Sequence, residues 1–245
     1  PQALVKHLTA KASVPHKLHG NLTGAAQFIE NFKHRKTVAT AMREAFSPAV
    51  APTALHAWLA ALPALPLLVH AWYDDLPQRA LAGRRDWGAL QGVSQAEHSG
   101  AWCHAFDAAG NLAPIEAAAD WTTLLYQPLG SVAPAGNFLV SDSDFVEVLT
   151  EIDIQTPIPA EVQRRRAGRQ FLFLGCRFDD QLTRTFARQV MKRSSDHHYA
   201  VLADTPTRNE ARFLVEQNIE LVRLPLTDFV AELTGEARLA EAMAV

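Results

Sequence analysis

Cysteine is scarce in this sequence, because Cys103 and Cys176 are the only two among 245 residues. Two cysteines cannot build a disulfide framework or a four-cysteine zinc site. Both are expected to be reduced and buried, as is usual in a cytoplasmic protein. The composition therefore excludes the disulfide-stapled class and the four-cysteine metal class.

A strong charge of one sign is also lacking. The chain carries 23 Lys and Arg against 26 Asp and Glu, for a net charge of −3. A balance of this kind gives no support for nucleic-acid binding. No apolar run approaches the ~20 residues that a membrane-spanning helix needs, and the stretch from Leu62 to Ala71 contains two prolines. We expect no nucleic-acid partner, no membrane partner and a cytoplasmic location.

What the chain does contain is a clear alternation of helical and extended patterns. Apolar periodicity and capping residues predict helices over 1–12, from Asn21 or Thr23 to His34, and over 36–46, 53–61, 76–81, 141–151, 159–166, 180–193, 207–217 and 227–243. Extended apolar runs predict strands over 65–71, 87–93, 101–106, 121–127, 137–140, 170–175, 198–203 and 219–223. Strands that alternate with helices of ten to fifteen residues favour an α/β fold with a doubly wound, mostly parallel sheet.

Five blocks in a fixed order connect this pattern to a known family. The most informative is Phe171 to Asp180, in which an apolar strand meets a glycine and then a short acidic loop. The other blocks are 28–32 with 47–56, then 67–75, 124–130 and 137–145. Together they resemble the sirtuin-like family, in its bacterial branch without a zinc ribbon. The resemblance implies a sirtuin-like Rossmann fold with a helical or irregular insert.

The resemblance covers nearly the whole chain and implies one sirtuin-like domain over residues 1–245. Within it we expect a helical segment (1–64), a strand with an irregular insert (65–136) and a regular β/α half (137–245). The family opens with a strand and a glycine-rich loop whose amides hold a pyrophosphate. Nothing before residue 20 matches that loop. We expect it to precede Pro1, and the alternative is that the protein never had it.

Two departures from the family pattern carry the functional hypothesis. The resemblance implies an asparagine that positions a water or ribose hydroxyl, and a histidine that acts as general base in cleaving the nicotinamide bond. Trp72 and Leu129 stand at these positions. An indole N–H cannot accept a hydrogen bond and leucine cannot take a proton. We therefore expect a non-catalytic member that binds no cofactor, although a NAD-cleaving enzyme or a NAD or ADP-ribose sensor stays open.

Candidate residues follow for each alternative. If the chain is an enzyme, His70, Tyr73 and Asp74 are the catalytic candidates, although His70 reads more simply as a structural residue and Asp74 as a helix cap. If NAD binds, the resemblance points to Gly175, Cys176 and Asp74. Gly175 also suits a tight turn, and Cys176 a buried strand end.

The expected partner is another protein, which the chain would serve as an accessory, assembly or quality-control factor. The tryptophans Trp87, Trp102 and Trp121 of region 84–136 are candidates for an interaction hot spot. The basic run Arg164, Arg165 and Arg166 is read either as a solvated helix end or as a site for an acidic partner. The degenerate motifs resemble sirtuin-like accessory proteins of nitrogen-fixing bacteria, which implies a nitrogenase metalloprotein as the client.

One apparent motif is a decoy. Lys17 to Gly20 spells the family's Lys-Leu-His-Gly base motif, but it follows a helix and precedes the segments that should come before it. We interpret it as a chance match in a polar loop. His7, His16 and His19 have no acidic or cysteine neighbour at ligand spacing, so no metal site is expected there.

Overall fold

The computed structural model describes residues 2–10, 12–95, 100–151 and 158–235, and these divide into two compact units. The first unit comprises residues 1–52 and 63–159, and the second comprises 53–62 and 160–245. Each unit has its own sheet and its own buried apolar cluster. The expectation of one domain over the whole chain stays a prediction.

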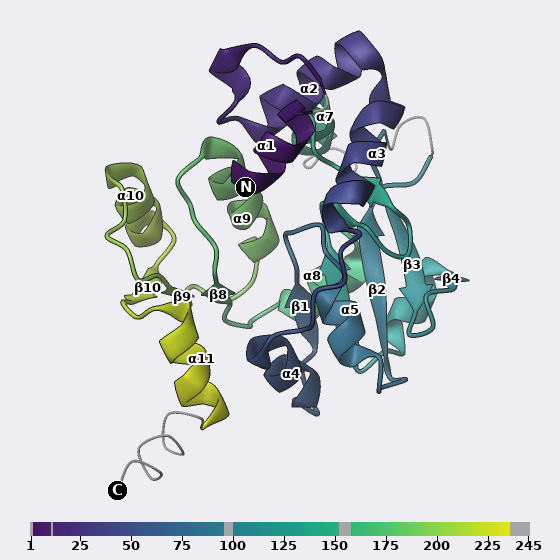
Figure 1. The fold of residues 1–245 in the computed structure, drawn as a ribbon. Coiled ribbons are helices and arrows are strands. Elements are labelled where there is room, and N and C mark those ends of the chain that lie inside the picture. The colour runs from purple at the N-terminus through teal and green to yellow at the C-terminus, as the bar shows by residue number, and fades with distance from the viewer. Residues whose placement is uncertain (1, 11, 96–99, 152–157, 236–245) are drawn as a thin grey trace, which may run out of the picture. The chain divides into compact units, whose positions relative to one another are not determined.

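The first unit begins with three helices, drawn in purple and dark blue in Figure 1. They are α1 (Gln2–Ala10), α2 (Leu22–Lys33) and α3 (Arg35–Phe46), with the 3-10 turn η1 (His16–Leu18) after α1. Leu4, Val5 and Leu8 form the buried stripe of α1, as its periodicity predicts. The Asn21 side chain caps α2 by accepting a hydrogen bond from the Gly24 amide at 3.0 Å, which decides between the two predicted caps.

A five-stranded sheet completes the core of the first unit. Its strands are β1 (Leu67–Val69), β2 (Trp87–Gly92), β3 (Cys103–Asp107), β4 (Leu112–Ala113) and β5 (Thr123–Gln127), and their order is β1-β5-β2-β3-β4. The strands β1, β5 and β2 run parallel, whereas β3 and β4 add antiparallel pairs at one edge. The first unit also contains α5 (Leu76–Leu81), η2 (Ile115–Ala119), β6 (Gly130–Ser131), β7 (Asn137–Phe138) and α7 (Asp142–Glu151).

The second unit holds a three-stranded parallel sheet in the order β10-β9-β8. Its elements are α4 (Ala54–Ala61), α8 (Ala160–Arg166), β8 (Leu172–Leu174), α9 (Gln181–Met191), β9 (His198–Val201), α10 (Arg208–Glu216), β10 (Ile219–Val222) and α11 (Leu226–Thr234). Phe178, Phe213, Ala200 and Leu214 form the centre of its apolar cluster. The mixed α/β architecture with mostly parallel strands confirms the predicted fold class.

The predicted elements are found where the described residues test them, and the strands are shorter than predicted. The segment 65–71 pairs only over Leu67–Val69, and 137–140 only over Asn137–Phe138. The insert is more regular than expected, because β3, β4 and η2 follow one another in it. The part of the predicted last helix beyond residue 235, the ends of the first helix at residues 1 and 11, and residues 96–99 lie outside the described residues.

Candidate functional site

Polar side chains line up where the parallel strands of the first unit end. The register pairs Val69 with Tyr126 and Gln91 with Gln127. His70, the next residue after β1, donates its backbone N–H to the Tyr126 carbonyl at 2.9 Å and so extends the pairing by one position. His70, Gln127 and Gln91 therefore form one row across three adjacent strands. In an open α/β sheet this carboxyl edge is where ligands bind.

Neutral amides join this row into a buried network. The Oε1 atom of Gln127 accepts hydrogen bonds from the Nε2 atoms of Gln91 at 2.8 Å and Gln78 at 2.7 Å. The Ala133 carbonyl accepts from the same two amides at 2.7 Å and 3.2 Å. Gln91, Gln127 and Ser131 are all completely buried. These hydrogen bonds between buried neutral amides hold the edge in place, although Oε1 of Gln78 is buried without a hydrogen-bond partner.

His70 lies at the outer end of the row, between Gln127 and Asp74. Its Nδ1 atom is 3.4 Å from Gln127 Nε2, and its Nε2 atom is 3.6 Å from Asp74 Oδ1. Since an amide N–H donates, Nδ1 of His70 accepts, and Nε2 carries the proton that faces Asp74. Asp74 also accepts from the Leu76 amide at 3.0 Å. The structure thus brings together two of the three candidate catalytic residues.

The third candidate, Tyr73, points into an apolar cluster instead. It is 2% exposed, and its hydroxyl donates to the Leu139 carbonyl at 2.8 Å. Burial raises the pKa of this phenol above its ordinary value. A neutral, fully buried tyrosine bonded to a carbonyl is a packing residue, because its hydroxyl is not available to a substrate.

Trp72 and Leu129 pack against this same cluster. Both are half-buried hydrophobic residues in contact with the core that contains Tyr73 and Phe138. The Trp72 ring lies 5.3 Å from that of Tyr73 and 6.1 Å from that of Phe46 in an edge-on arrangement. The two positions are therefore occupied by side chains that contribute burial and dispersion.

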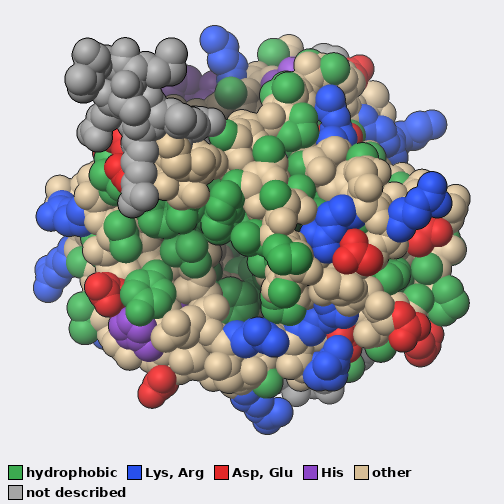
Figure 2. Space-filling model, turned by 90° about the horizontal axis from the view of Figure 1, so that it is seen from below, with side chains coloured by type: hydrophobic (Ala, Val, Ile, Leu, Met, Phe, Trp, Pro, Cys, Tyr) green, Lys and Arg blue, Asp and Glu red, His purple; other side chains and the backbone are tan. Residues whose placement is uncertain are grey.

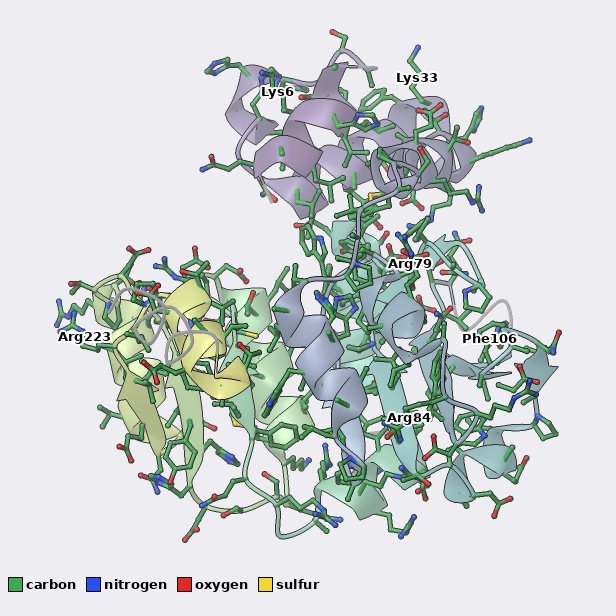
Figure 3. The ribbon with its side chains drawn as sticks, turned by 60° about the horizontal axis from the view of Figure 1, so that its bottom comes forward. Lys6, Lys33, Arg79, Arg84, Phe106 and Arg223 are labelled. Carbon is green, nitrogen blue, oxygen red and sulfur yellow. The ribbon has the colours of Figure 1, made fainter. Side chains whose placement is uncertain are left out.

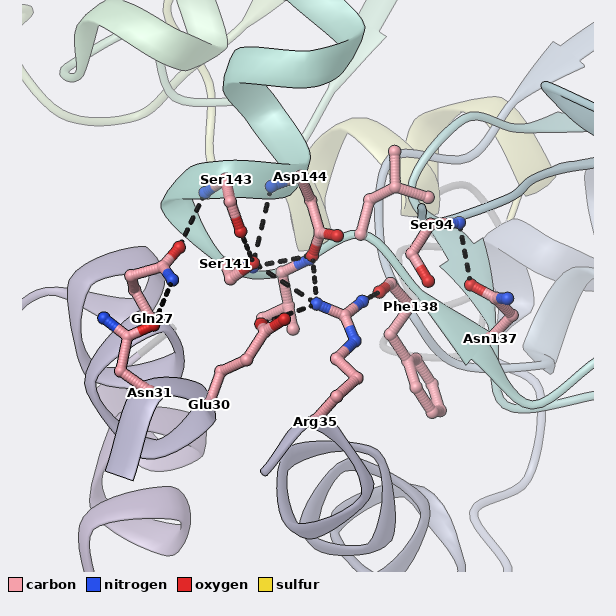
Figure 4. A network of polar contacts seen from close by, with 12 residues as sticks. Gln27, Glu30, Asn31, Arg35, Ser94, Asn137, Phe138, Ser141, Ser143 and Asp144 are labelled. Atoms are coloured by element: carbon pink, nitrogen blue, oxygen red, sulfur yellow. Dashed lines mark hydrogen bonds and ion pairs between the residues drawn. The ribbon is translucent and has the colours of Figure 1, made fainter. Parts of the chain in front are cut away.

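A second network holds the segment after these positions in place, and Figure 4 shows it. The Arg35 guanidinium donates to Glu30 at 2.9 Å, Asp144 at 2.8 Å and the Phe138 carbonyl. Asp144 also accepts from the Ser141 amide at 2.9 Å. A buried carboxylate with an arginine and a backbone amide is fully compensated. The network ties α3 to β7 and α7, and so supports the carbonyl that Tyr73 uses.

Comparison of the sequence with known protein families identifies the family of this chain. Residues 66–222, more than half of the chain, match the sequence model described as a SIR2-like domain. The chain belongs to the SIR2-like family. No curated protein matches it. The matched range includes both the sheet edge of the first unit and the parallel sheet of the second.

The SIR2-like fold implies NAD, and the two residues that the resemblance places at the catalytic positions, Trp72 and Leu129, do not fit its cleavage. Hydrolysis at the nicotinamide ribose needs an acceptor and a base, whereas Trp72 offers one N–H donor and Leu129 offers neither. Both side chains already pack against the apolar core. The same edge carries the amides of Gln78, Gln91 and Gln127, which bond to one another, and the pair His70 and Asp74. We therefore derive no step through NAD at these residues.

The other residues that the resemblance assigns to NAD lie in the second unit, apart from Asp74. Gly175 has φ +66°, and a Cβ there would lie 3.4 Å from Leu226, so a positive φ explains this glycine in the turn after β8. Burial raises the pKa of the Cys176 thiol to about 11, which makes it a poor nucleophile at neutral pH. The predicted tight turn accounts for Gly175, whereas Cys176 is half-buried and not fully buried as predicted.

Charged contacts close the loop after Cys176. Arg177 donates to Glu210 at 2.9 Å and 3.1 Å and to Asp204 at 3.1 Å. Glu210, which is completely buried, also accepts from the amides of Phe178 and Thr207. The Arg177 guanidinium lowers the pKa of this carboxyl to about 2.

The predicted partner residues are divided between surface and core. Arg165 and Arg166 are 7% and 4% exposed. Arg165 donates to Glu161, and Arg166 donates to the carbonyls of Gln189 and Val190. This corrects both interpretations of the basic run, because these two guanidinium groups satisfy backbone and carboxylate acceptors inside the second unit. Arg164 alone of the three stays exposed, beside Glu161.

The three candidate tryptophans also differ in their exposure to solvent. Trp87 is 4% exposed and belongs to the core, which removes it from a partner surface. Trp102 and Trp121 are half-buried. Trp121 lies flat against Gly88, where a Cβ would come within 2.4 Å of its ring. The glycine in β2 therefore makes room for this tryptophan.

The structure also bears on the apparent base motif, on metal and membrane-spanning segments, and on the cap of α5. His19 of the decoy motif bonds the Val14 carbonyl at 3.1 Å within its own loop. Among the residues that the structure describes, there is no cluster of three His, Cys, Asp or Glu side chains suited to a metal. No helix in the described part of the chain is long and apolar enough to cross a membrane. The Asp74 side chain accepts a hydrogen bond from an amide at the start of α5, as the helix-cap interpretation of this residue predicts.

Sequence reasoning missed the residues of the amide network. Gln127 ends a predicted strand, Gln91 falls near the end of another, and Gln78 falls in a predicted helix. Glutamine is usually exposed, so none of the three attracted notice alone. A signal was present, since Gln91 and Gln127 are polar residues near the carboxyl ends of two mostly apolar strands.

Proposed function

We propose that this SIR2-like chain is a non-catalytic scaffold that binds another protein as an accessory, assembly or quality-control factor. The observation that carries the proposal is the packing of Trp72 and Leu129 against the apolar core at two positions that need an amide and an imidazole. A shared fold does not preserve chemistry once its reacting groups are replaced. General base catalysis alone is worth about 10²–10⁴ in rate.

Exposed apolar residues of the insert offer the scaffold a contact surface. Leu112 in β4 is 71% exposed and Ile115 in η2 is 44% exposed. Both follow β3 and lie in the same insert as the half-buried Trp102 and Trp121. We call these four residues the insert face. Aromatic and apolar side chains of this kind anchor protein interfaces. Charged side chains of both signs are interspersed on the face drawn in Figure 2.

A turnover assay tests the loss of chemistry. Full-length protein is incubated with NAD while nicotinamide release and the thermal unfolding midpoint are followed. We expect no release and no NAD-induced shift. Release that His70→Ala abolishes would instead establish an enzyme. A thermal shift without release would establish a sensor of NAD or ADP-ribose.

The enzyme alternative has one specific observation in its favour. His70 lies 3.6 Å from Asp74 at the carboxyl edge of the parallel strands, an arrangement that could orient a base. Asp74→Asn separates the two cases. In an enzyme it lowers turnover with little change in stability, whereas in a scaffold NAD turnover is absent from parent and variant alike.

A matched pair of variants tests the insert face. Affinity purification of the native protein identifies the client, expected from the resemblance to be a nitrogenase component. Leu112→Glu should weaken its retention by about tenfold or more, the effect of placing a charge in an apolar interface. Val215→Glu, at an 82% exposed position of α10 in the second unit, should leave retention unchanged. Equal effects of the two substitutions would remove the insert face from the proposal.

A further inference from the structure

A histidine side chain joins the amino ends of two strands in the second unit. His198 begins β9 and is 3% exposed. Its Nδ1 atom lies 3.0 Å from the backbone nitrogen of Phe171, the residue before β8. The backbone adds a second contact, because the Tyr199 N–H donates to the Phe171 carbonyl at 2.9 Å. Phe171 is therefore tied to β9 by one backbone and one side-chain hydrogen bond.

The contact with Phe171 fixes the protonation state of the imidazole. A backbone N–H donates, so Nδ1 of His198 is the unprotonated acceptor and the proton of the neutral ring is on Nε2. The Nε2 atom lies 3.5 Å from Ser194 Oγ, which donates its own hydrogen to the Met191 carbonyl. The Ser195 backbone also forms a hydrogen bond with the ring. His198 is therefore held as one neutral tautomer.

Burial dominates the pKa of this imidazole. It lowers the pKa of His198 below its ordinary value, and His197 lowers the pKa further. A backbone hydrogen bond and Asp196 act in the opposite direction and are weaker. On β10, Glu220 is engaged by His197 at 3.4 Å. The charged side chains of the surrounding segments are exposed, and they are Arg169 before β8 and Lys192 and Arg193 after α9. The charged form of the ring is thus disfavoured while the contact is closed.

The strand β8 depends on this contact because it is the last strand of its sheet. The strands β8, β9 and β10 lie side by side, in green and yellow-green in Figure 3. In the part of the chain that the structure describes, β8 pairs with β9 alone. Its first residue, Leu172, is 43% exposed. A strand that is paired on one side and exposed at its amino end can separate locally without unfolding the rest of the unit.

We propose that His198 is an acid-sensitive clasp that joins β8 to β9 at neutral pH and releases the amino end of β8 when the imidazole is protonated. A charged imidazole has no acceptor, so a proton on Nδ1 would set two donors against each other at 3.0 Å. The proton therefore enters only when Phe171 and the ring move apart. The clasp uses neither Trp72 and Leu129 nor the insert face, so it can fail while the proposed function holds, and the reverse.

Nuclear magnetic resonance of the full-length protein tests the clasp without any substitution. The ring nitrogens of His198 should show the neutral form protonated on Nε2 at neutral pH, and the ring should titrate with a midpoint below about 6.5. Amide hydrogen exchange is measured in parallel and corrected for the intrinsic effect of pH. Protection of the Phe171 amide should fall about tenfold between about pH 7.5 and about pH 5.5, because the open ring takes up a proton that the closed ring excludes. The amides of β5 in the first unit should keep their protection.

Two substitutions of His198 separate the acceptor from the proton. In His198→Asn, the side-chain oxygen takes the place of Nδ1 and does not titrate, so protection of the Phe171 amide should not depend on pH. In His198→Gln, the amide nitrogen takes the place of Nε2 and the Nδ1 acceptor is lost. Protection should then be about tenfold lower at neutral pH than in the parent. His197→Gln is the matched control, a neighbouring histidine paired with Glu220, and it should keep the pH response.

Three results would overturn the clasp. A His198 ring that titrates at or above about 6.5 would show that the contact does not exclude the proton. Equal protection of the Phe171 amide at both pH values would show that protonation does not release β8. A pH response that survives in His198→Asn, or that His197→Gln removes, would assign the response to another group. The first two results come from the parent protein, so they decide the proposal even where a variant does not fold.

Discussion

The segments that follow the parallel strands are held by different physical means in the two units. In the first unit, Trp72, Tyr73 and Leu129 pack into an apolar cluster, and buried neutral glutamines bond to one another. In the second unit, Arg177 and Glu210 close the loop after β8 with a charged pair. Burial of apolar surface depends little on salt or acid, whereas ion pairs depend on both. The same sheet edge is therefore stabilised by burial in one unit and by charge in the other.

This difference bears on the proposed function. An edge that binds a charged dinucleotide needs groups that are free to turn toward it. At the first edge, the glutamines are buried and bonded to one another, whereas His70 and Asp74 are partly exposed. At the second, the carboxylate of Glu210 is bonded to Arg177 and to two amides. The internal bonding of the glutamines and of Glu210 supports the proposed scaffold.

Truncation of Tyr73 should cause the largest loss of unfolding free energy, and this loss of stability should be confined to the first unit. Tyr73→Ala removes a fully buried ring from the cluster with Phe46 and Phe138. The loss of a large buried side chain costs about 3–5 kcal/mol of unfolding free energy. Urea denaturation measures the loss of unfolding free energy. In a separate experiment on the native protein, amide hydrogen exchange should become faster in β1 and β7 and stay unchanged in β9 and β10.

The conservative variant separates packing from hydrogen bonding. Tyr73→Phe keeps the ring and loses the donor to the Leu139 carbonyl, so it should cost only about 1 kcal/mol. If Tyr73→Phe destabilised the protein as strongly as Tyr73→Ala, the edge would depend on that hydrogen bond and the contrast with the second unit would weaken.

Neutralisation of Glu210 should cause the next largest loss of unfolding free energy, in the second unit. Glu210→Gln keeps the shape and removes the charge that Arg177 and two backbone amides engage. Hydrogen bonds to a charged group contribute about 1.5–3 kcal/mol, and we expect a loss near the middle of that range. Hydrogen exchange of α10 and β9 should accelerate, while β5 should be unaffected. Faster exchange in β5 would mean that the two edges are not independent.

The pH dependence of stability provides a second test of the contribution of the Glu210 carboxyl. Its folded-state pKa is lowered to about 2 from an ordinary value of 4.5 by Arg177. A lowered pKa contributes stability above the ordinary value, and that contribution is lost as the pH falls from 4.5 toward 2. The difference in unfolding free energy between the parent and Glu210→Gln should therefore shrink across this interval. A difference that stays constant to pH 2 would contradict the assignment of the lowered pKa.

The fold was largely predictable from sequence because its elements have strong local signals. Asn21, Thr53, Asp180 and Thr207 each cap the helix that they precede. Strand ends were harder, since pairing and not composition decides them: Leu65 and Ala71 are as apolar as β1 but lie beyond its partner on β5. The two-residue strands β4 and β6 are too short for a periodic pattern.

The candidate site was only partly predictable. The assignment of Trp72 and Leu129 to the catalytic positions comes from the resemblance and stays a prediction, whereas the structure shows that both pack against an apolar cluster. The burial of Arg165 and Arg166 could not be predicted, since their acceptors are the carbonyls of Gln189 and Val190 and the carboxylate of Glu161. Backbone carbonyls leave no trace in a sequence. The amide network depends likewise on which residues share a register.

The smallest expected loss of unfolding free energy comes from Asp204, the exposed carboxylate that pairs with Arg177. Asp204 is 80% exposed and lies 3.1 Å from Arg177, so it shares that guanidinium with the buried Glu210. Exposed ion pairs contribute about 0.2–1 kcal/mol, and salt screens them. Asp204→Asn should lower the unfolding free energy by at most about 0.5 kcal/mol, and this small loss should vanish in ~1 M salt. A loss as large as that of Glu210→Gln would show that the loop is closed at its surface, and that burial does not distinguish the two carboxylates.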